Sequence, residues 1–310
     1  MVGAPAGGSL PRGGLCVVTG GNNGIGKEVA GGLMKEGAHV VLGCRSLARC
    51  REAKAELDSR GLPGTCECQM LDLCSVSSVR GFTSTVAKAS SATGLRVLIN
   101  NAGVMGLPGD PEPLKDGHLL PNHLGPFLLT NQLLHCMRPG SRVVNVASRA
   151  HFQGSLEIGD SGQGGGRGPS IIGTPSSWYH SYARSKLCNV LHMAELQRRM
   201  DDGGHGVMAF SVSPGLVNTG IFRNVWAPLR WALSPLIHAV YQTPEQGART
   251  VLHAACSPEL KQGGLYLHNL KAATPAALAQ EPALARGLWA ASERLIEVAE
   301  EQERQKCGQQ

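Results

Sequence analysis

The stretch TGGNNGIG, residues 19–26, decides the fold of this chain. It follows the short β-branched run LCVVTG (15–20) and precedes GKEVAGGLMKEG (26–37), which has helical spacing and ends in glycine. This order predicts a strand, a tight turn and a helix. Glycines in the turn leave out side chains where a backbone approaches a pyrophosphate, and the helix N-terminus beyond them presents free N–H groups.

A glycine cluster by itself is weak evidence, because the chain contains 41 glycines. Its position between a strand and a helix favours a dinucleotide-binding turn over an ordinary loop. The residues predicted to bind the cofactor in this turn are Gly20, Asn22, Asn23, Gly24, Ile25 and Gly26.

Strand-like and helix-like segments alternate along the rest of the chain. This alternation predicts an α/β fold, a doubly wound (Rossmann) parallel sheet of about seven strands with helices on both faces. The predicted strands after the first are AHVVLGC (38–44), TCECQMLDL (65–73), LRVLINNAG (95–103), SRVVNVAS (141–148), GVMAFSVSPG (206–215) and GGLYLH (263–268).

The segments form one predicted domain, residues 13–274, after a disordered N-terminus at 1–12. A Gly/Ser/Pro-rich insert at 159–177 is expected to be a flexible loop. The tail at 275–310 is expected to be helical.

Composition restricts the partners and the compartment. The net charge of +6 is modest and the basic residues are scattered, which argues against nucleic acid as a partner. We find no signal peptide and no run of about 18 apolar residues, so we expect no secretion, no transmembrane segment, and a place in the cytoplasm or peripheral to an intracellular membrane. The ten cysteines include no CxxC and no zinc spacing, which predicts reduced thiols and no metal site.

The end of the second strand, VVLGCRS, bears on the choice of cofactor. No acid occurs between Glu36 and Glu52, whereas a free ribose hydroxyl is usually held there by Asp or Glu. Arg45 offers a fork suited to a 2′-phosphate, so NADP(H) is favoured over NAD(H). The alternative is that Arg45 is simply solvated.

Two other strand ends bear polar groups, namely LDL (71–73) and INNAG (99–103). Open parallel sheets bind ligands at the carboxyl ends of their strands. Seen alone, a pair of asparagines before glycine is more typical of an ordinary turn.

Ser148 ends the fifth strand, and Tyr182 and Lys186 lie four residues apart near the start of the next helix. That spacing puts both side chains on one helical face. A nearby ammonium stabilises a phenolate, so we expect Lys186 to lower the pKa of Tyr182 from about 10 and prepare it for proton exchange. Tyr179 is seven residues before the lysine and is assigned to packing or to a pocket mouth. One Y-x-x-x-K match alone often arises by chance.

Because these motifs occur together and in order, the chain resembles the short-chain dehydrogenase/reductase family over roughly residues 13 to 270. The phrases NHLGPFLLT, VVNVASRAH and YARSKLCNVL look most like the retinol dehydrogenase and WW-domain oxidoreductase group. TPEQGARTVLHAACSPELKQGGLYL is similar to the X-linked dehydrogenase/reductase branch. The resemblance implies a nicotinamide cofactor and hydride transfer to or from a carbonyl carbon.

The resemblance also implies roles for particular residues. Tyr182 would exchange a proton with the substrate oxygen, Ser148 would hydrogen-bond that oxygen, and Lys186 would bind the nicotinamide ribose. Asn122 would hold a water that relays protons to the lysine. The other implied cofactor contacts are Arg45 at the 2′-phosphate, Asp72 and Leu73 at the adenine, Asn101, Ala102 and Gly103 at the adenosine side, and Pro214, Gly215, Val217 and Thr219 at the nicotinamide amide and phosphates.

The segment DGHLLPNHLGPF (116–127) departs from the family pattern. It is about three residues shorter than in relatives, and it places Pro121 and Pro126 around Asn122, where interior prolines remove helix hydrogen bonds. In the family this helix often helps to form a dimer interface, so both a monomer and a homodimer are expected possibilities.

The expected function is an NADP(H)-dependent oxidoreductase acting on a lipophilic carbonyl or alcohol, such as a retinoid, isoprenoid, steroid or a broad range of aldehydes. An apolar segment near 219–242 is the expected substrate lid and could contact a membrane surface. The alternative is a catalytically weakened NADP(H)-binding sensor or scaffold protein, suggested by the prolines around Asn122.

Overall fold

The fold is described from a computed structural model, in which residues 13–160, 168–173, 175–215 and 242–307 are placed. Within these residues an eight-stranded central sheet has the order β10-β9-β8-β5-β4-β1-β2-β3. Its strands are β1 Leu15–Thr19, β2 His39–Cys44, β3 Thr65–Met70, β4 Leu95–Asn100, β5 Met137–Val146, β8 Met208–Ser213, β9 Leu265–His268 and β10 Lys271–Ala273.

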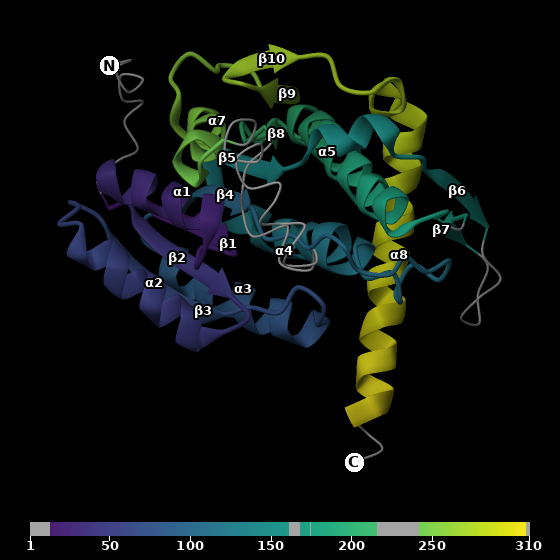
Figure 1. Cartoon of the computed structure of the whole chain (residues 1–310), viewed down its shortest axis with the longest axis horizontal. Coiled ribbons are helices and arrows are strands. Elements are labelled where there is room, and N and C mark those ends of the chain that lie inside the picture. The colour runs from purple at the N-terminus through teal and green to yellow at the C-terminus, as the bar shows by residue number, and fades with distance from the viewer. Residues whose placement is uncertain (1–12, 161–167, 174, 216–241, 308–310) are drawn as a thin grey trace, which may run out of the picture.

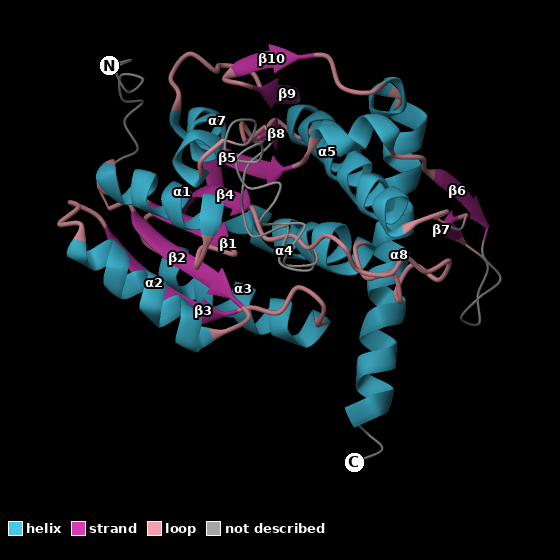
Figure 2. Ribbon diagram, in the orientation of Figure 1, coloured by secondary structure: helices cyan, strands magenta, loops and turns pink. Residues whose placement is uncertain are grey.

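Helices cover both faces of the sheet (Figures 1 and 2). The predicted α/β doubly wound class is therefore confirmed. The longer helices are α1 Gly24–Lys35, α2 Leu47–Ser59, α3 Val76–Ser90, α4 Gly125–Leu133, α5 Trp178–Asp202, α7 Pro244–Cys256 and α8 Pro282–Cys307.

Strand β1, inside the sheet, is buried along its whole length because helices cover both of its faces. In β1, Leu15 and Val17 join the core beneath α3, α4 and α5, whereas Cys16 and Val18 join the core beneath α1 and α7. Successive side chains of a strand point to opposite faces, so one short run supplies both cores. This double use explains why the predicted strands read as continuous apolar runs.

The sheet has one strand more than the predicted seven. β10 pairs antiparallel with β9 at the edge, while the other pairings in this sheet are parallel. A strand joined to its neighbour by a two-residue turn must run antiparallel, and Asn269 and Leu270 both adopt positive φ in that turn.

The insert at 159–177 is not a loop throughout, which corrects the expectation for its ends. β6 (Glu157–Asp160) and β7 (Pro169–Ile172) pair antiparallel as a separate two-stranded sheet. Glycine and serine content predicted irregular structure, but pairing between distant ends is a tertiary contact that composition does not reveal. Residues 161–167 and 174 lie outside the described part of the insert.

One pair of cysteines is oxidised, so the expectation of uniformly reduced thiols is wrong for it. Cys50 of α2 and Cys68 of β3 form a disulfide with their Cα atoms 5.9 Å apart. The two residues are 18 apart in sequence, and packing of α2 on the adjacent strand brings them together. Among the described residues no cluster of metal-ligating side chains is found.

The long helix α8 crosses the outside of the layer formed by α4 and α5 (Figure 1). Its apolar face, including Leu288 and Trp289, is buried in the core on that side. Its acidic end reaches α3, where the carboxylate of Glu303 accepts hydrogen bonds from the Val76 and Ser77 backbone N–H groups at 2.8 and 3.0 Å. Across the described ranges, none of the helices has the length and apolar character needed to span a bilayer. The expected lid lies almost entirely outside them.

Candidate active site

The predicted phosphate-binding turn joins β1 to α1. Gly20 and Gly24 have φ angles of 65° and 51°, in the left-handed region that favours glycine. At Gly26 a Cβ would collide with the Gly20 carbonyl oxygen and with the side-chain amide of Asn101. Asn23 caps α1, because its side-chain oxygen accepts from the Gly24 N–H at 2.8 Å. The turn therefore leaves the N-terminus of α1 open toward the cavity.

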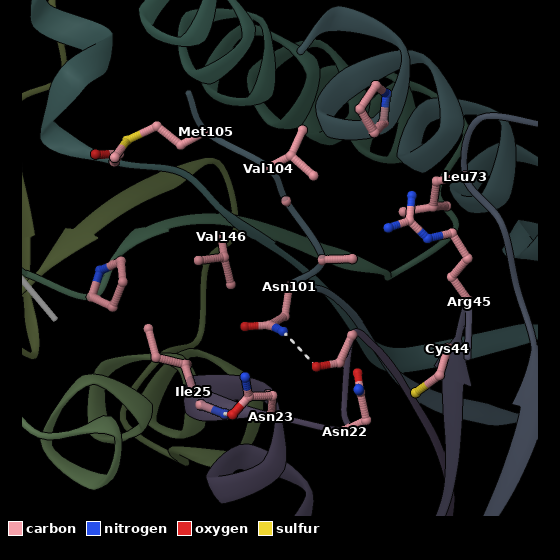
Figure 3. Close-up of a pocket in the computed structure, with 18 of the residues that line it drawn as sticks. Asn22, Asn23, Ile25, Cys44, Arg45, Leu73, Asn101, Val104, Met105 and Val146 are labelled. Carbon is pink, nitrogen blue, oxygen red and sulfur yellow. Dashed lines mark hydrogen bonds between the residues drawn. The ribbon is translucent and has the colours of Figure 1, made fainter. Parts of the chain in front are cut away.

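Two side chains lock the turn to the end of β4. The Asn101 side-chain amide donates to the Thr19 carbonyl at 2.9 Å. It donates more weakly to the Gly20 carbonyl at 3.4 Å (Figure 3). The Thr19 hydroxyl oxygen accepts from the backbone N–H groups of Asn101 and Ala102, each at 3.0 Å. The NNAG segment thus serves as a brace for the turn, and not as an ordinary loop. Thr19 was not among the predicted site residues, since its hydroxyl partners lie 82 and 83 positions away.

A cavity of about 1120 Å³ opens at the carboxyl ends of the strands (Figure 3). It is lined by every predicted site residue in the described ranges except Asn122. Val217 and Thr219 lie outside the described residues. The cavity brings together the turn, Arg45 after β2, Asp72 and Leu73 after β3, NNAG after β4, Ser148 after β5, Tyr182 and Lys186 on α5, and Pro214 with Gly215 after β8.

Arg45 is exposed at the rim of this cavity, directly after β2 (Figure 3). Among the described residues it forms no ion pair with a carboxylate. Arg49, one turn into α2, lines the same rim. Two guanidinium groups therefore face the part of the cavity next to the second strand.

Lys186 lies deep on the opposite side of the cavity. Its ammonium donates to the Val146 carbonyl at 2.9 Å and lies 5.6 Å from the centre of the Tyr182 ring. Burial lowers the pKa of Lys186 to about 8, because a charged amine is costly away from water. The helical spacing predicted this proximity correctly.

The pKa of Tyr182 moves in the direction opposite to the prediction. Burial of the phenol raises it to about 12, and the hydrogen bond from Ser148 offsets only part of that rise. The Lys186 ammonium, 5.6 Å from the centre of the ring, does not overcome this rise in pKa. Within the protein chain alone, Tyr182 is therefore a firmly protonated phenol at neutral pH.

Asn122 is buried behind the cavity in a short π-helical turn, Leu120–Leu124, that runs directly into α4. Its side-chain oxygen accepts from the Val104 N–H at 2.8 Å, and its amide donates to the Val104 carbonyl and the Ser185 hydroxyl, both at 3.0 Å. The helix is not broken by the prolines, because the π turn accommodates them. Pro126 has no N–H, so it cannot donate to the Asn122 carbonyl four residues earlier.

The chain is similar in sequence and in fold to known proteins. The family model for short chain dehydrogenases matches residues 15–159. Retinol dehydrogenase 14 of Mus musculus is 34% identical over 307 residues, 93% of this chain and 87% of that protein. Polyprenol dehydrogenase of Mus musculus is 36% identical over 292 residues, 91% of this chain and 83% of that protein. The crystal structure of an uncharacterized protein from Mycobacterium paratuberculosis has a TM-score of 0.70 and 30% identity, covering 93% of this chain and 96% of its own.

Proposed function

Since the chain belongs to the short-chain dehydrogenase/reductase family, we propose that it is an NADP(H)-dependent oxidoreductase that interconverts a lipophilic alcohol and its aldehyde or ketone. The observation that supports this most strongly is the meeting of Ser148, Tyr182 and Lys186 on the cavity that also contains the glycine-rich turn. The same cavity thus contains the proposed dinucleotide site and the proposed proton donor.

The side chains divide the chemistry between them. In the reducing direction the Tyr182 hydroxyl gives its proton to the carbonyl oxygen as that oxygen becomes an alkoxide. The Ser148 hydroxyl donates to the same oxygen and stabilises its developing charge. The chemistry that a nicotinamide bound in the cavity would supply is hydride transfer to the carbonyl carbon, or from the alcohol carbon in the reverse direction. Lys186, held by the Val146 carbonyl, places an ammonium beside the phenol that loses its proton.

The raised pKa of Tyr182 has a directional consequence. A protonated phenol is ready to donate, so carbonyl reduction can begin from the form present at neutral pH. Alcohol oxidation needs the phenolate, so its rate should rise as the pH becomes alkaline.

The preference for NADP(H) rests on the rim of the cavity. Arg45 offers a planar fork with five donors, which suits the geometry of a phosphate. Its side chain is not neutralised by an acid in the described part of the protein. Arg49 adds a second positive charge to the same rim.

The lipophilic substrate class rests on the relatives and on the cavity wall. Two relatives are named for retinol and polyprenol, which are both long apolar alcohols. In this chain Met105, Phe152 and Tyr179 line the same cavity as Tyr182, and Phe152 is half exposed. Apolar and aromatic surfaces of this kind suit a chain or ring of hydrocarbon.

The rival proposal, a catalytically weakened NADP(H)-binding sensor or scaffold protein, rested on the prolines in the helix around Asn122. That side chain is buried and hydrogen-bonded at three points in a continuous helical segment. No observation in the described residues now favours the rival.

The test is turnover by the purified protein with NADPH and a panel of retinoid, isoprenoid, steroid and simple aldehydes. We expect reduction of at least one class, with kcat lowered about 1000-fold or more in Tyr182→Phe because the proton donor is lost. NADPH binding that is tight in both proteins, together with equal background turnover, would refute the enzyme proposal.

A further inference from the structure

Beside Tyr182 lies a buried polar cluster that does not line the cavity. Its members are Asp116, His118, Ser181 and Arg184, each no more than 4% exposed. Two of them precede the π turn, and the other two flank Tyr182 on the first turns of α5. Burying four polar side chains is costly unless every group is satisfied, so the hydrogen bonds of this cluster bear on its purpose.

The hydrogen bonds have a defined direction. The Leu107 backbone N–H can only donate, so His118 Nε2 accepts it at 3.2 Å. His118 is therefore neutral with its proton on Nδ1, which donates to the Ser181 hydroxyl at 2.8 Å. The Ser181 proton is then directed to the Asp116 carboxylate, at 2.7 and 2.8 Å from its two oxygens. Burial also lowers the pKa of His118, which agrees with the neutral form.

The far end of this chain of bonds is held by charge. Asp116 forms an ion pair with Arg184 at 2.7 Å and accepts the backbone N–H groups of His118 and Leu119 at 2.8 and 3.0 Å. Arg184 also donates to the Gly173 carbonyl at 2.9 Å. The carboxylate thus has donors from its own segment and from the start of α5, and Arg184 joins both to the segment at Gly173.

The cluster is not the active site of a serine nucleophile. A serine nucleophile needs an exposed hydroxyl that gives its proton to a histidine. Here the Ser181 hydroxyl is buried and faces a carboxylate, with the histidine as donor to it. The arrangement can hold positions but cannot attack a substrate.

The positions it holds belong to the candidate active site. The His118 ring meets the Tyr182 ring edge-on with centroids 5.9 Å apart. Leu107 lies two residues after Met105, which lines the cavity together with Val104. Hydrogen bonds therefore connect this segment, through His118, to Ser181, the residue that precedes Tyr182.

We propose that Asp116, His118 and Ser181 are positioning residues for Tyr182, fixing the phenol against Ser148 and Lys186. The inference rests on the proposed function of Tyr182 as proton donor. A misplacement of about 1 Å in a reacting group can lower a rate about 100-fold, so a link that does not touch the substrate can still control turnover.

The central test compares three variants of the holoenzyme. Ser181→Ala removes the hydroxyl between His118 and Asp116, Ser181→Thr restores a hydroxyl, and Ser292→Ala is the matched control. Ser292 is fully buried and bonds His123 Nε2 at 2.8 Å, the same kind of pair outside the candidate site.

We expect Ser181→Ala to lower kcat about 10- to 100-fold while the KM for NADPH stays within about twofold, because the lost interaction acts on the phenol and not on the cofactor. Ser181→Thr should recover most of that kcat. Ser292→Ala should keep the kcat of the original protein even if its melting temperature falls as much as that of Ser181→Ala. An unchanged kcat in Ser181→Ala, or an equal fall in both alanine variants, would overturn the proposal.

A second measurement does not depend on turnover. The chain has four tyrosines, and labelling their Cζ atoms with ¹³C gives one NMR signal for each. The signal that disappears in Tyr182→Phe is that of Tyr182. We expect Ser181→Ala to move the Tyr182 signal and its titration midpoint, with the others in place, and Ser292→Ala to leave it unmoved. A Tyr182 signal that does not respond defeats the positioning proposal, whereas absence of turnover in the original protein defeats the proposed function instead.

Discussion

The glycine-rich turn and the first turns of α5 face the same cavity but are built in opposite ways. The turn is shaped by backbone, with left-handed glycines and with neutral hydrogen bonds that the Thr19 hydroxyl accepts and the Asn101 side-chain amide donates. The start of α5 is shaped by buried charges, namely Lys186 and the Asp116–Arg184 pair. A phosphate site can be read from consecutive residues because its geometry is local. A proton-transfer site depends on groups that only the folded chain brings together.

The difference also has an energetic side. Neutral hydrogen bonds to backbone cost little to bury when they are satisfied. A buried ammonium or ion pair loses its hydration, and the interactions with its partners offset only part of the free energy of that desolvation. We therefore expect the stability of the Tyr182 side of the cavity to be more sensitive to the loss of single charges, and that of the turn to be more sensitive to added side-chain volume.

The largest effect is expected at Asp116. Asp116→Ala leaves the Arg184 guanidinium buried without its carboxylate, which should lower the free energy of unfolding by about 3–5 kcal/mol. Denaturant unfolding followed by circular dichroism measures this. The control is Asp58→Ala, which removes the exposed partner of Lys54 and should cost no more than about 1 kcal/mol. Equal losses in the two variants would remove the contrast between buried and surface charges.

The next effect tests added volume in the turn. Gly26→Ala places a Cβ against the Gly20 carbonyl and the Asn101 amide, so the turn must shift away from its phosphate-binding shape. We expect NADPH affinity to fall about 100-fold, near 2.7 kcal/mol, by fluorescence titration. Gly81→Ala on α3 is the matched control, because a Cβ there meets no atom within 4 Å. Unaltered affinity in Gly26→Ala would contradict the close packing of the turn.

The cost of the buried ammonium can be measured through Lys186→Met. The folded pKa of about 8 lies below the ordinary 10.5, so the original protein bears the full penalty below pH 8 and gains stability as pH rises from 8 to 10.5. After the lost bond to Val146 is subtracted, the variant should be more stable by about 2 kcal/mol at pH 7. That advantage should shrink above pH 8. Thermal melts of both proteins at pH 7 and pH 10 measure this advantage. A stability difference that is the same at both pH values would count against the lowered pKa of Lys186.

The smallest effect concerns the cavity rim. Arg45→Ala should weaken NADPH about tenfold and change NADH by less than about twofold, since only NADPH offers a phosphate to the guanidinium. Titration of both cofactors measures the two constants. Equal weakening of both would mean that Arg45 does not read the 2′-phosphate.

Local patterns foretold much of the fold and of the candidate site. The period of apolar residues predicted the seven parallel strands of the central sheet, and the spacing of Tyr182 and Lys186 predicted their shared face. The eighth strand and the β6–β7 pair were missed because short edge strands have little periodicity of their own. The disulfide was missed because Cys50 and Cys68 meet only when α2 packs on β3.

At the site, helical spacing and nearby charge wrongly suggested a lowered pKa for Tyr182. Spacing measures proximity but not burial, and burial is the larger influence on the phenol. The prolines around Asn122 suggested a broken helix, because the sequence pattern does not show the local backbone geometry. A π turn accepts them while the side chain keeps its three hydrogen bonds.

The sequence by itself determined the doubly wound fold, the order of its motifs and the shape of the glycine-rich turn. These follow from side-chain period and from the φ angles open to glycine, which are properties of neighbouring residues. Tertiary structure alone decided the protonation of Tyr182, the brace from Thr19, and the link from His118 through Ser181 to Asp116. Each of these depends on burial and on contacts between residues tens of positions apart, because the free energy of a charge or a hydrogen bond is set by its surroundings.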